Sequence, residues 1–155
     1  MLTERAGLAA GAKLRVLEVG CGTGRWARDL VGEGPSAEGA AIGRYLGVDS
    51  SDTMAVAAAD ALSACPRAAV IRADAREPGA LREASRRFLA GLPDRIVMSY
   101  VLDLLDDSDA ELVLEECASL LRESGGQLCV CSIAPGTSVM ESWQEVWEAY
   151  PSLVG

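Results

Sequence analysis

The sequence has 155 residues, of which 50% are hydrophobic and 24% are charged, and its formal net charge is −9. A chain of this length forms one ordinary domain that buries roughly two thirds of its unfolded surface, and no stretch approaches the ~20 consecutive apolar residues of a membrane span. The negative charge opposes binding to a phosphate backbone, so we expect no nucleic-acid partner. The sequence contains no histidine, which excludes His-containing catalytic triads and His-ligated metal sites.

Residues 1–15 mix acidic and basic side chains without a compact apolar stretch, so no targeting segment is expected. The five cysteines are odd in number and scattered, which is typical of reduced thiols and favours a cytoplasmic enzyme. Cys129 and Cys131 share one face of a predicted strand and could ligate a metal ion. Without histidine or a second close pair, we interpret them as small buried residues and expect no metal site.

Short apolar runs alternate with segments of helical spacing along the chain. In chain order, the expected elements are a strand at 13–19, a helix at 25–31, a strand at 44–48, a helix at 53–64, a strand at 68–72, a helix at 80–89, a strand at 95–101, a helix from the capping box at 108–111 to Gly125, and a strand at 127–133. This alternation predicts a doubly wound α/β fold, a mostly parallel sheet with helices on both faces. We expect a single domain over residues 1–155.

A second capping box begins at Ser138, and Trp143 and Trp147 follow it at helical spacing. A stripe of this kind is typical of core packing. The wall of a substrate pocket is the alternative.

Three glycines, Gly20, Gly22 and Gly24, follow the first predicted strand. Ligands of open α/β sheets bind at such strand ends, and glycine lets the backbone turn sharply and approach a ligand closely. The spacing is Gly-x-Gly-x-Gly, whereas the dinucleotide fingerprint is Gly-x-Gly-x-x-Gly. The spacing therefore disfavours a nicotinamide-dependent oxidoreductase, which stays as a weaker alternative. A plain tight turn is the structural alternative for the loop.

With Glu18 two residues before the first glycine, this phrase resembles motif I of the class I S-adenosylmethionine-dependent methyltransferases, which have a seven-strand, Rossmann-like sheet. The resemblance extends from about Val16 to Ile133. It implies that the loop, with Gly20, Cys21, Gly22 and Gly24, and the following helix N-terminus receive the amino-acid end of S-adenosyl-L-methionine. It also implies that Glu18 favours the cofactor's ammonium group.

The ends of the second and third predicted strands carry acidic residues that match the same family. The resemblance implies that Asp49, followed by Ser50, accepts both ribose hydroxyls. It implies that Asp74 accepts from the adenine amino group while the amide of Ala75 meets the ring, and Met54 is placed to cover an adenine face. The structural alternatives are that Asp49 is a neighbour of a helix cap and that Asp74 is a solvated loop acid.

After the fourth predicted strand, the resemblance places Ser99 and Tyr100 beside the transferred methyl. We name no catalytic acid or base, because the sulfonium methyl is already activated and such enzymes need mainly alignment and desolvation.

The family sheet normally ends in an antiparallel hairpin of two further strands, and little sequence follows Ile133. An apolar fifth strand would then be an open edge, which is an aggregation hazard. We therefore expect a domain incomplete at its C-terminus, or a homodimer through the fifth-strand edge.

The predicted function is methyl transfer from S-adenosyl-L-methionine to a small-molecule acceptor by in-line displacement. The alternative from another class is a catalytically inactive methyltransferase-like binding or regulatory protein. It would bind the cofactor without transferring the methyl group.

Overall fold

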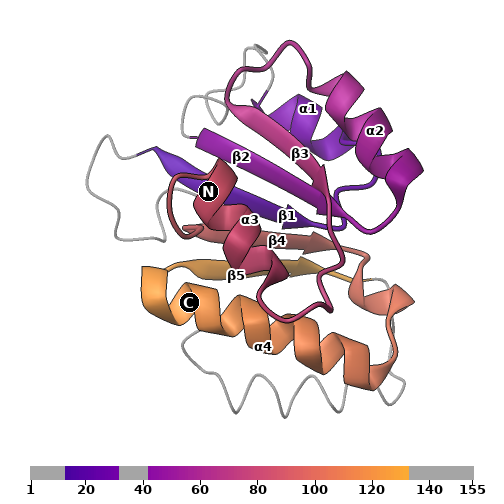
Figure 1. The fold of residues 1–155 in the computed structure, drawn as a ribbon, viewed down its shortest axis with the longest axis vertical. Coiled ribbons are helices and arrows are strands. Elements are labelled where there is room, and N and C mark those ends of the chain that lie inside the picture. The colour runs from indigo at the N-terminus through magenta and orange to yellow at the C-terminus, as the bar shows by residue number, and fades with distance from the viewer. Residues whose placement is uncertain (1–12, 32–41, 133–155) are drawn as a thin grey trace.

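The computed structural model describes residues 13–31 and 42–132, which form one parallel sheet with helices on both sides (Figure 1). The strands are β1 (Leu14–Val19), β2 (Ile42–Asp49), β3 (Ala68–Arg72), β4 (Arg95–Ser99) and β5 (Gln127–Cys131). The helices are α1 (Arg25–Val31), α2 (Asp52–Ala61), α3 (Ala80–Phe88) and α4 (Asp107–Ser124), with a short 3-10 helix, η2 (Leu102–Leu104). The expected doubly wound α/β class is confirmed.

The strand order is β3-β2-β1-β4-β5, and every neighbouring pair is parallel. The chain moves outward from β1 to β3, then crosses to β4 on the other side of β1. This reversal creates a topological switch point at the carboxyl ends of β1 and β4, where ligands of doubly wound sheets bind.

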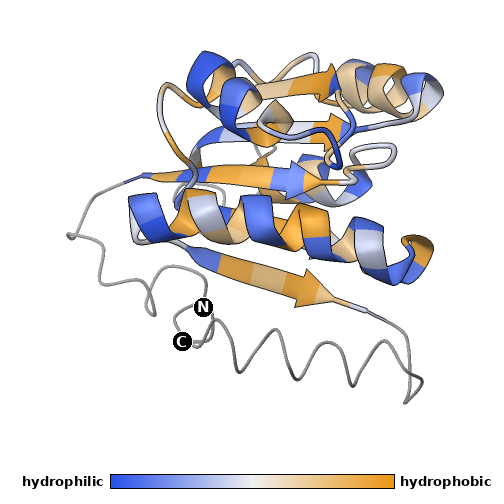
Figure 2. Ribbon diagram, turned by 60° about the horizontal axis from the view of Figure 1, so that its bottom comes forward, coloured by the Kyte–Doolittle hydropathy of each residue, from blue (hydrophilic) through white to orange (hydrophobic). Residues whose placement is uncertain are grey.

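Two apolar cores hold the layers together. One packs α3 and α4 against the sheet through residues such as Leu81, Leu114 and Leu121, and the other packs α1 against the opposite face through Ala27 and Leu30. The strands are largely apolar, while α4 alternates hydrophobic and hydrophilic stretches (Figure 2). This is the pattern of a sheet covered on both faces by amphipathic helices.

Several predicted boundaries were wrong. α2 ends at Ala61, three residues before the predicted end at residue 64. α4 begins earlier than expected, because Asp106 rather than Ser108 is its N-cap and accepts a hydrogen bond from the Asp109 amide at 2.8 Å. β4 ends at Ser99 rather than Val101, because Tyr100 takes a left-handed backbone with φ 60°. β2 begins at Ile42, two residues before the predicted start.

Some of the predicted features lie outside the described residues. The second capping box at Ser138, the stripe with Trp143 and Trp147, and the end of the fifth predicted strand at Ile133 all lie there. Among the described residues, no helix is both long and apolar enough to cross a membrane.

Candidate functional site

The glycine loop after β1 is fixed against the end of β2 by its backbone. The amides of Gly20 and Cys21 both donate to the Val48 carbonyl, at 2.8 and 3.0 Å. Gly20, Gly22 and Gly24 all have positive φ values of 53–70°. The loop therefore needs glycine for its backbone geometry, as the sequence predicts.

The three glycines differ in what surrounds them. A Cβ at Gly20 would overlap the Val101 side chain, and one at Gly24 would lie 3.1 Å from the Cα of Ala58. A Cβ at Gly22 would meet nothing within 4 Å. Gly20 and Gly24 thus serve close packing, whereas Gly22 leaves open space in front of the loop that a ligand can approach.

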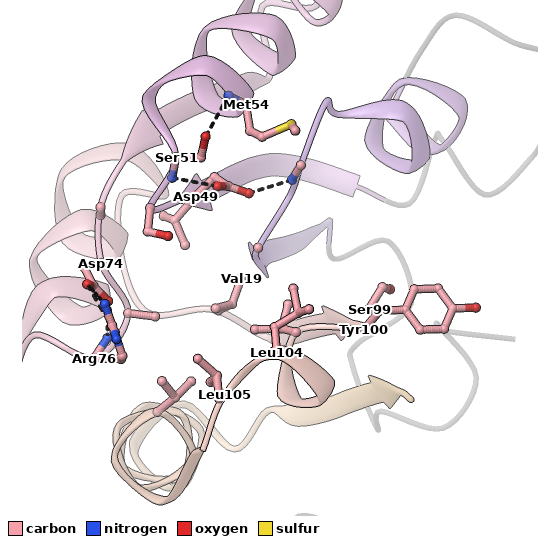
Figure 3. Close-up of a pocket in the computed structure, with 18 residues that line it drawn as sticks. Val19, Asp49, Ser51, Met54, Asp74, Arg76, Ser99, Tyr100, Leu104 and Leu105 are labelled. Atoms are coloured by element: carbon pink, nitrogen blue, oxygen red, sulfur yellow. Dashed lines mark hydrogen bonds and ion pairs between the residues drawn. The ribbon is translucent and has the colours of Figure 1, made fainter. Parts of the chain in front are cut away.

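Asp49, the last residue of β2, links this loop to α2. Its Oδ2 accepts from the Gly22 amide and its Oδ1 from the Ser51 amide, both at 2.9 Å (Figure 3). Ser51 in turn caps α2, because its Oγ accepts from the Met54 amide at 3.4 Å. Each carboxylate oxygen has two lone pairs, so each retains one acceptor position.

Glu18 lies behind the glycine loop. It is 3% exposed, and its Oε2 accepts a hydrogen bond from the hydroxyl of Tyr45, which is 1% exposed. Gly47 makes room for this pair, since a Cβ there would lie 3.0 Å from the Tyr45 oxygen and 2.9 Å from Cys21 Sγ. Burial raises the pKa of Glu18 to about 7, against the lowering effect of the Tyr45 hydrogen bond.

A cavity of about 590 Å³ opens at the carboxyl ends of β1 to β4 (Figure 3). Its polar lining comes from the glycine loop and the ends of β2, β3 and β4: Gly20, Gly22, Asp49, Ser50, Ser51, Asp74, Arg76, Ser99 and Tyr100. Its apolar lining comes from strand ends, α2, η2 and α4: Val19, Val48, Met54, Ala73, Ala75, Val101, Leu104, Leu105 and Val113. The volume is in the range of small-molecule and cofactor sites.

The structure gathers most of the predicted site residues around this cavity. Nine of the twelve line it, and the other three, Glu18, Cys21 and Gly24, lie outside its lining. Cys21 and Gly24 shape the loop from behind, and Cys21 is buried. The ring of Tyr100 points away from the centre of the cavity (Figure 3), and the residue is 49% exposed.

Asp74 is held by a residue that the sequence analysis did not identify. The guanidinium of Arg76 donates to both carboxylate oxygens of Asp74 and also reaches Asp109 on α4. The residues Ser51, Val101, Leu104 and Leu105 were also missed. The sequence did contain a signal for Leu104 and Leu105. They are large apolar residues in the segment that follows a strand end, where the chain is not required to contribute to the core.

Together, the switch point, the glycine loop and two carboxylates at neighbouring strand ends define a nucleotide-cofactor-binding domain of the doubly wound class. The sequence profile of the "Methyltransferase domain" family matches residues 16–125. The chain therefore belongs to this methyltransferase family, whose methyl donor is S-adenosyl-L-methionine.

Solved structures are similar to this chain in fold. The methyltransferase domain of bacterial CtHen1-CN is 17% identical over 88% of this chain and 76% of its own, with a TM-score of 0.65. The N-methyltransferase NodS from Bradyrhizobium japonicum WM9, in complex with S-adenosyl-l-homocysteine, is 19% identical with a TM-score of 0.54, and the match covers 75% of this chain. The [4+2]-cyclase SpnF is 19% identical over 70% of this chain, with a TM-score of 0.52.

The chain corresponds to 51% of NodS and 35% of SpnF. A comparison with curated proteins finds no significant match.

Proposed function

We propose that this protein transfers a methyl group from S-adenosyl-L-methionine to a small-molecule acceptor. The observation that carries the proposal is the hydrogen bond from the Gly22 amide to Asp49 Oδ2, since both residues line the cavity. This bond fixes the glycine loop next to the carboxylate that we assign to the ribose. The residues fit the cofactor. Gly22 leaves open space, Asp49 and Asp74 offer acceptors at separate strand ends, and apolar side chains lie between them.

In this proposal the chain's residues act by position. The open face of the loop at Gly22 receives the amino-acid end of the cofactor, Asp49 accepts from the ribose hydroxyls, and Met54 covers the base. Val101 and Leu105 exclude water from the reacting region, and Ser99 lies at its edge. When bound, the cofactor supplies a methyl group on a sulfonium, which is already activated, so alignment and desolvation are the main tasks of the protein.

We propose indirect roles for Glu18 and Tyr100, because neither side chain points into the cavity. Glu18 acts on the ammonium group from its buried position behind the loop, where it carries a negative charge once the pH exceeds its raised pKa of about 7. Tyr100 contributes through its backbone and the base of its side chain, because its ring points outward.

The first test is a thermal-shift and calorimetric titration with S-adenosylhomocysteine, with NAD as the control. A ligand at ~100 times its dissociation constant stabilises a folded protein by about 2.7 kcal/mol. We expect a shift with S-adenosylhomocysteine alone. A shift with NAD alone would support the oxidoreductase alternative, and the absence of any shift from a folded chain would refute the cofactor assignment.

A second candidate is a catalytically inactive binding or regulatory protein. We keep it because SpnF, which is similar in fold, is a [4+2]-cyclase, so this fold alone does not imply methyl transfer. A screen of small acceptors with methyl-labelled cofactor separates the two, because only the enzyme produces labelled acceptor. We further propose a cytoplasmic location, consistent with five free thiols, and a homodimer through the β5 edge.

A further inference from the structure

The carboxylate of Asp74 is held in one orientation by a single neighbour, Arg76. Its Oδ1 accepts from the backbone amide of Arg76 at 3.0 Å and from Nε at 2.9 Å. Its Oδ2 accepts from Nη2 at 2.7 Å and more weakly from Nε at 3.2 Å. Three N–H groups of Arg76 therefore occupy three of the four lone-pair positions of the carboxylate.

Arg76 is itself anchored to a second element, α4. Its Nη1 donates to Asp109 Oδ2 at 2.8 Å, and Asp109 lies in the first turn of α4. The guanidinium thus spans from the segment after β3 to the start of α4, and both Asp74 and Arg76 line the cavity (Figure 3). A bidentate guanidinium fixes the plane of a carboxylate more strictly than an ammonium group does.

This arrangement leaves Asp74 with one acceptor position and no donor. The hydrogen bonds from Arg76 lower the pKa of Asp74 to about 2, so its carboxylate is ionised at every physiological pH. An ionised carboxylate accepts a hydrogen bond from the 6-amino group of adenine. It has nothing to donate to a 6-oxo group and repels it.

We propose that Arg76 is a positioning residue for the adenine end of the cofactor, which holds the Asp74 carboxylate so that its remaining lone pair selects a 6-amino purine over a 6-oxo purine. This inference rests on the proposed function. It assigns the discrimination between 6-amino and 6-oxo purines to Asp74 and Arg76 together rather than to Asp74 alone.

The test is calorimetric, with S-adenosylhomocysteine and its 6-oxo analogue S-inosylhomocysteine as ligands. Arg76→Met removes the guanidinium and leaves an unbranched, uncharged side chain. We expect it to weaken S-adenosylhomocysteine binding about tenfold or more and to reduce the preference for the 6-amino ligand. In an Asp74→Asn background, Arg76→Met should change the affinity by less than about twofold, because the two residues act as one unit.

Arg82→Met is the matched control. Like Arg76, Arg82 donates hydrogen bonds to α4: from α3 it reaches Glu123 at 2.6 Å and Ser119 at 3.1 Å. Unlike Arg76, it does not line the cavity. It should leave both affinities unchanged. Arg76→Lys, tested alongside, keeps the charge and covers the case in which the methionine variant does not fold.

Equal losses for both ligands, or an undiminished effect of Arg76→Met in the Asp74→Asn background, would overturn the inference while leaving the cofactor assignment in place. If the unmodified protein binds neither ligand, the proposed function fails and the inference fails with it.

Discussion

At the scale of single residues, Asp49 connects local folding to ligand binding. Its two oxygens order the glycine loop through Gly22 and the start of α2 through Ser51. From the sequence, Asp49 could be a ribose acceptor or a neighbour of a helix cap. The structure shows the second contact directly and leaves room for the first, because each oxygen retains a lone pair.

We expect Asp49→Ala to lower the affinity for S-adenosylhomocysteine by ~1.5–3 kcal/mol, the usual worth of hydrogen bonds that involve a charge. The loss combines the ribose contacts with the release of the Gly22 amide. Calorimetry measures it. Asp60→Ala, which removes an exposed acid from the same helix region, is the control, and an unchanged affinity in Asp49→Ala would refute the ribose assignment.

Glu18 makes a second prediction at this scale, which concerns stability. Its pKa is raised from an ordinary 4.5 to about 7, first by burial, so the folded state holds a proton that the unfolded chain has released. This contribution to stability is complete below about pH 4.5 and is lost as the pH rises toward 7. Glu18→Gln removes the titration and keeps an acceptor for the Tyr45 hydroxyl.

The ligand-free Glu18→Gln variant should therefore gain stability relative to the unmodified protein between pH 5 and pH 8, measured by urea midpoints. Glu83→Gln, at an exposed position on α3, should show no such trend. A constant difference across the pH range would contradict the raised pKa of Glu18.

At the scale of elements, the start of α4 shows how a local sequence signal can mislead. Asp106 precedes the helix and Ser108 lies in its first turn, and both residue types are good N-caps. The capping-box spacing favoured Ser108, yet the Ser108 hydroxyl only donates to Asp106 Oδ1, at 2.8 Å, while Asp106 accepts from the Asp109 amide. An earlier cap extends the helix and brings Asp109 into its first turn.

We expect Asp106→Ala to reduce the free energy of unfolding by about 1 kcal/mol, the usual cost of losing an N-cap. Ser108→Ala should lower the free energy of unfolding clearly less, because the Ser108 hydroxyl only donates to the capping carboxylate of Asp106. Urea unfolding of the two variants measures the difference. A larger loss in Ser108→Ala would restore the original assignment.

The elements also show what the sequence could and could not predict. The order of strands and helices followed from periodicity and from glycine punctuation, because these depend on neighbours in sequence. The partnership of Arg76 with Asp109 and the burial of Glu18 against Tyr45 did not, because each joins residues more than 25 positions apart. A strand-end acid can be located from sequence, but which lone pairs remain free depends on tertiary contacts.

At the scale of the whole molecule, the two ends of the sheet have different roles: one end binds the ligand and the other contributes to stability. The carboxyl ends carry the cavity. At the amino ends, Asp94 joins β1 to the start of β4, since its Oδ2 accepts from the Arg15 amide at 2.8 Å and from Nε at 3.0 Å, and its Oδ1 from Nη2 at 2.9 Å. These residues lie away from the cavity lining.

We expect Asp94→Asn to reduce the free energy of unfolding by about 1–3 kcal/mol, because three hydrogen bonds lose their charged acceptor. Burial alone would raise the pKa of Asp94, but the bonds from Arg15 outweigh it and lower that pKa, so the unmodified protein loses this contribution as the pH falls through the lowered value. The variant should show a weaker acid dependence in urea unfolding. Its affinity for S-adenosylhomocysteine, measured where it is fully folded, should stay within about twofold of the unmodified protein, since the site is at the opposite end of the same strands. A loss of affinity comparable to that of Asp49→Ala would show instead that the sheet transmits strain from its amino ends to the loop, and that stability and binding are not separable in this fold.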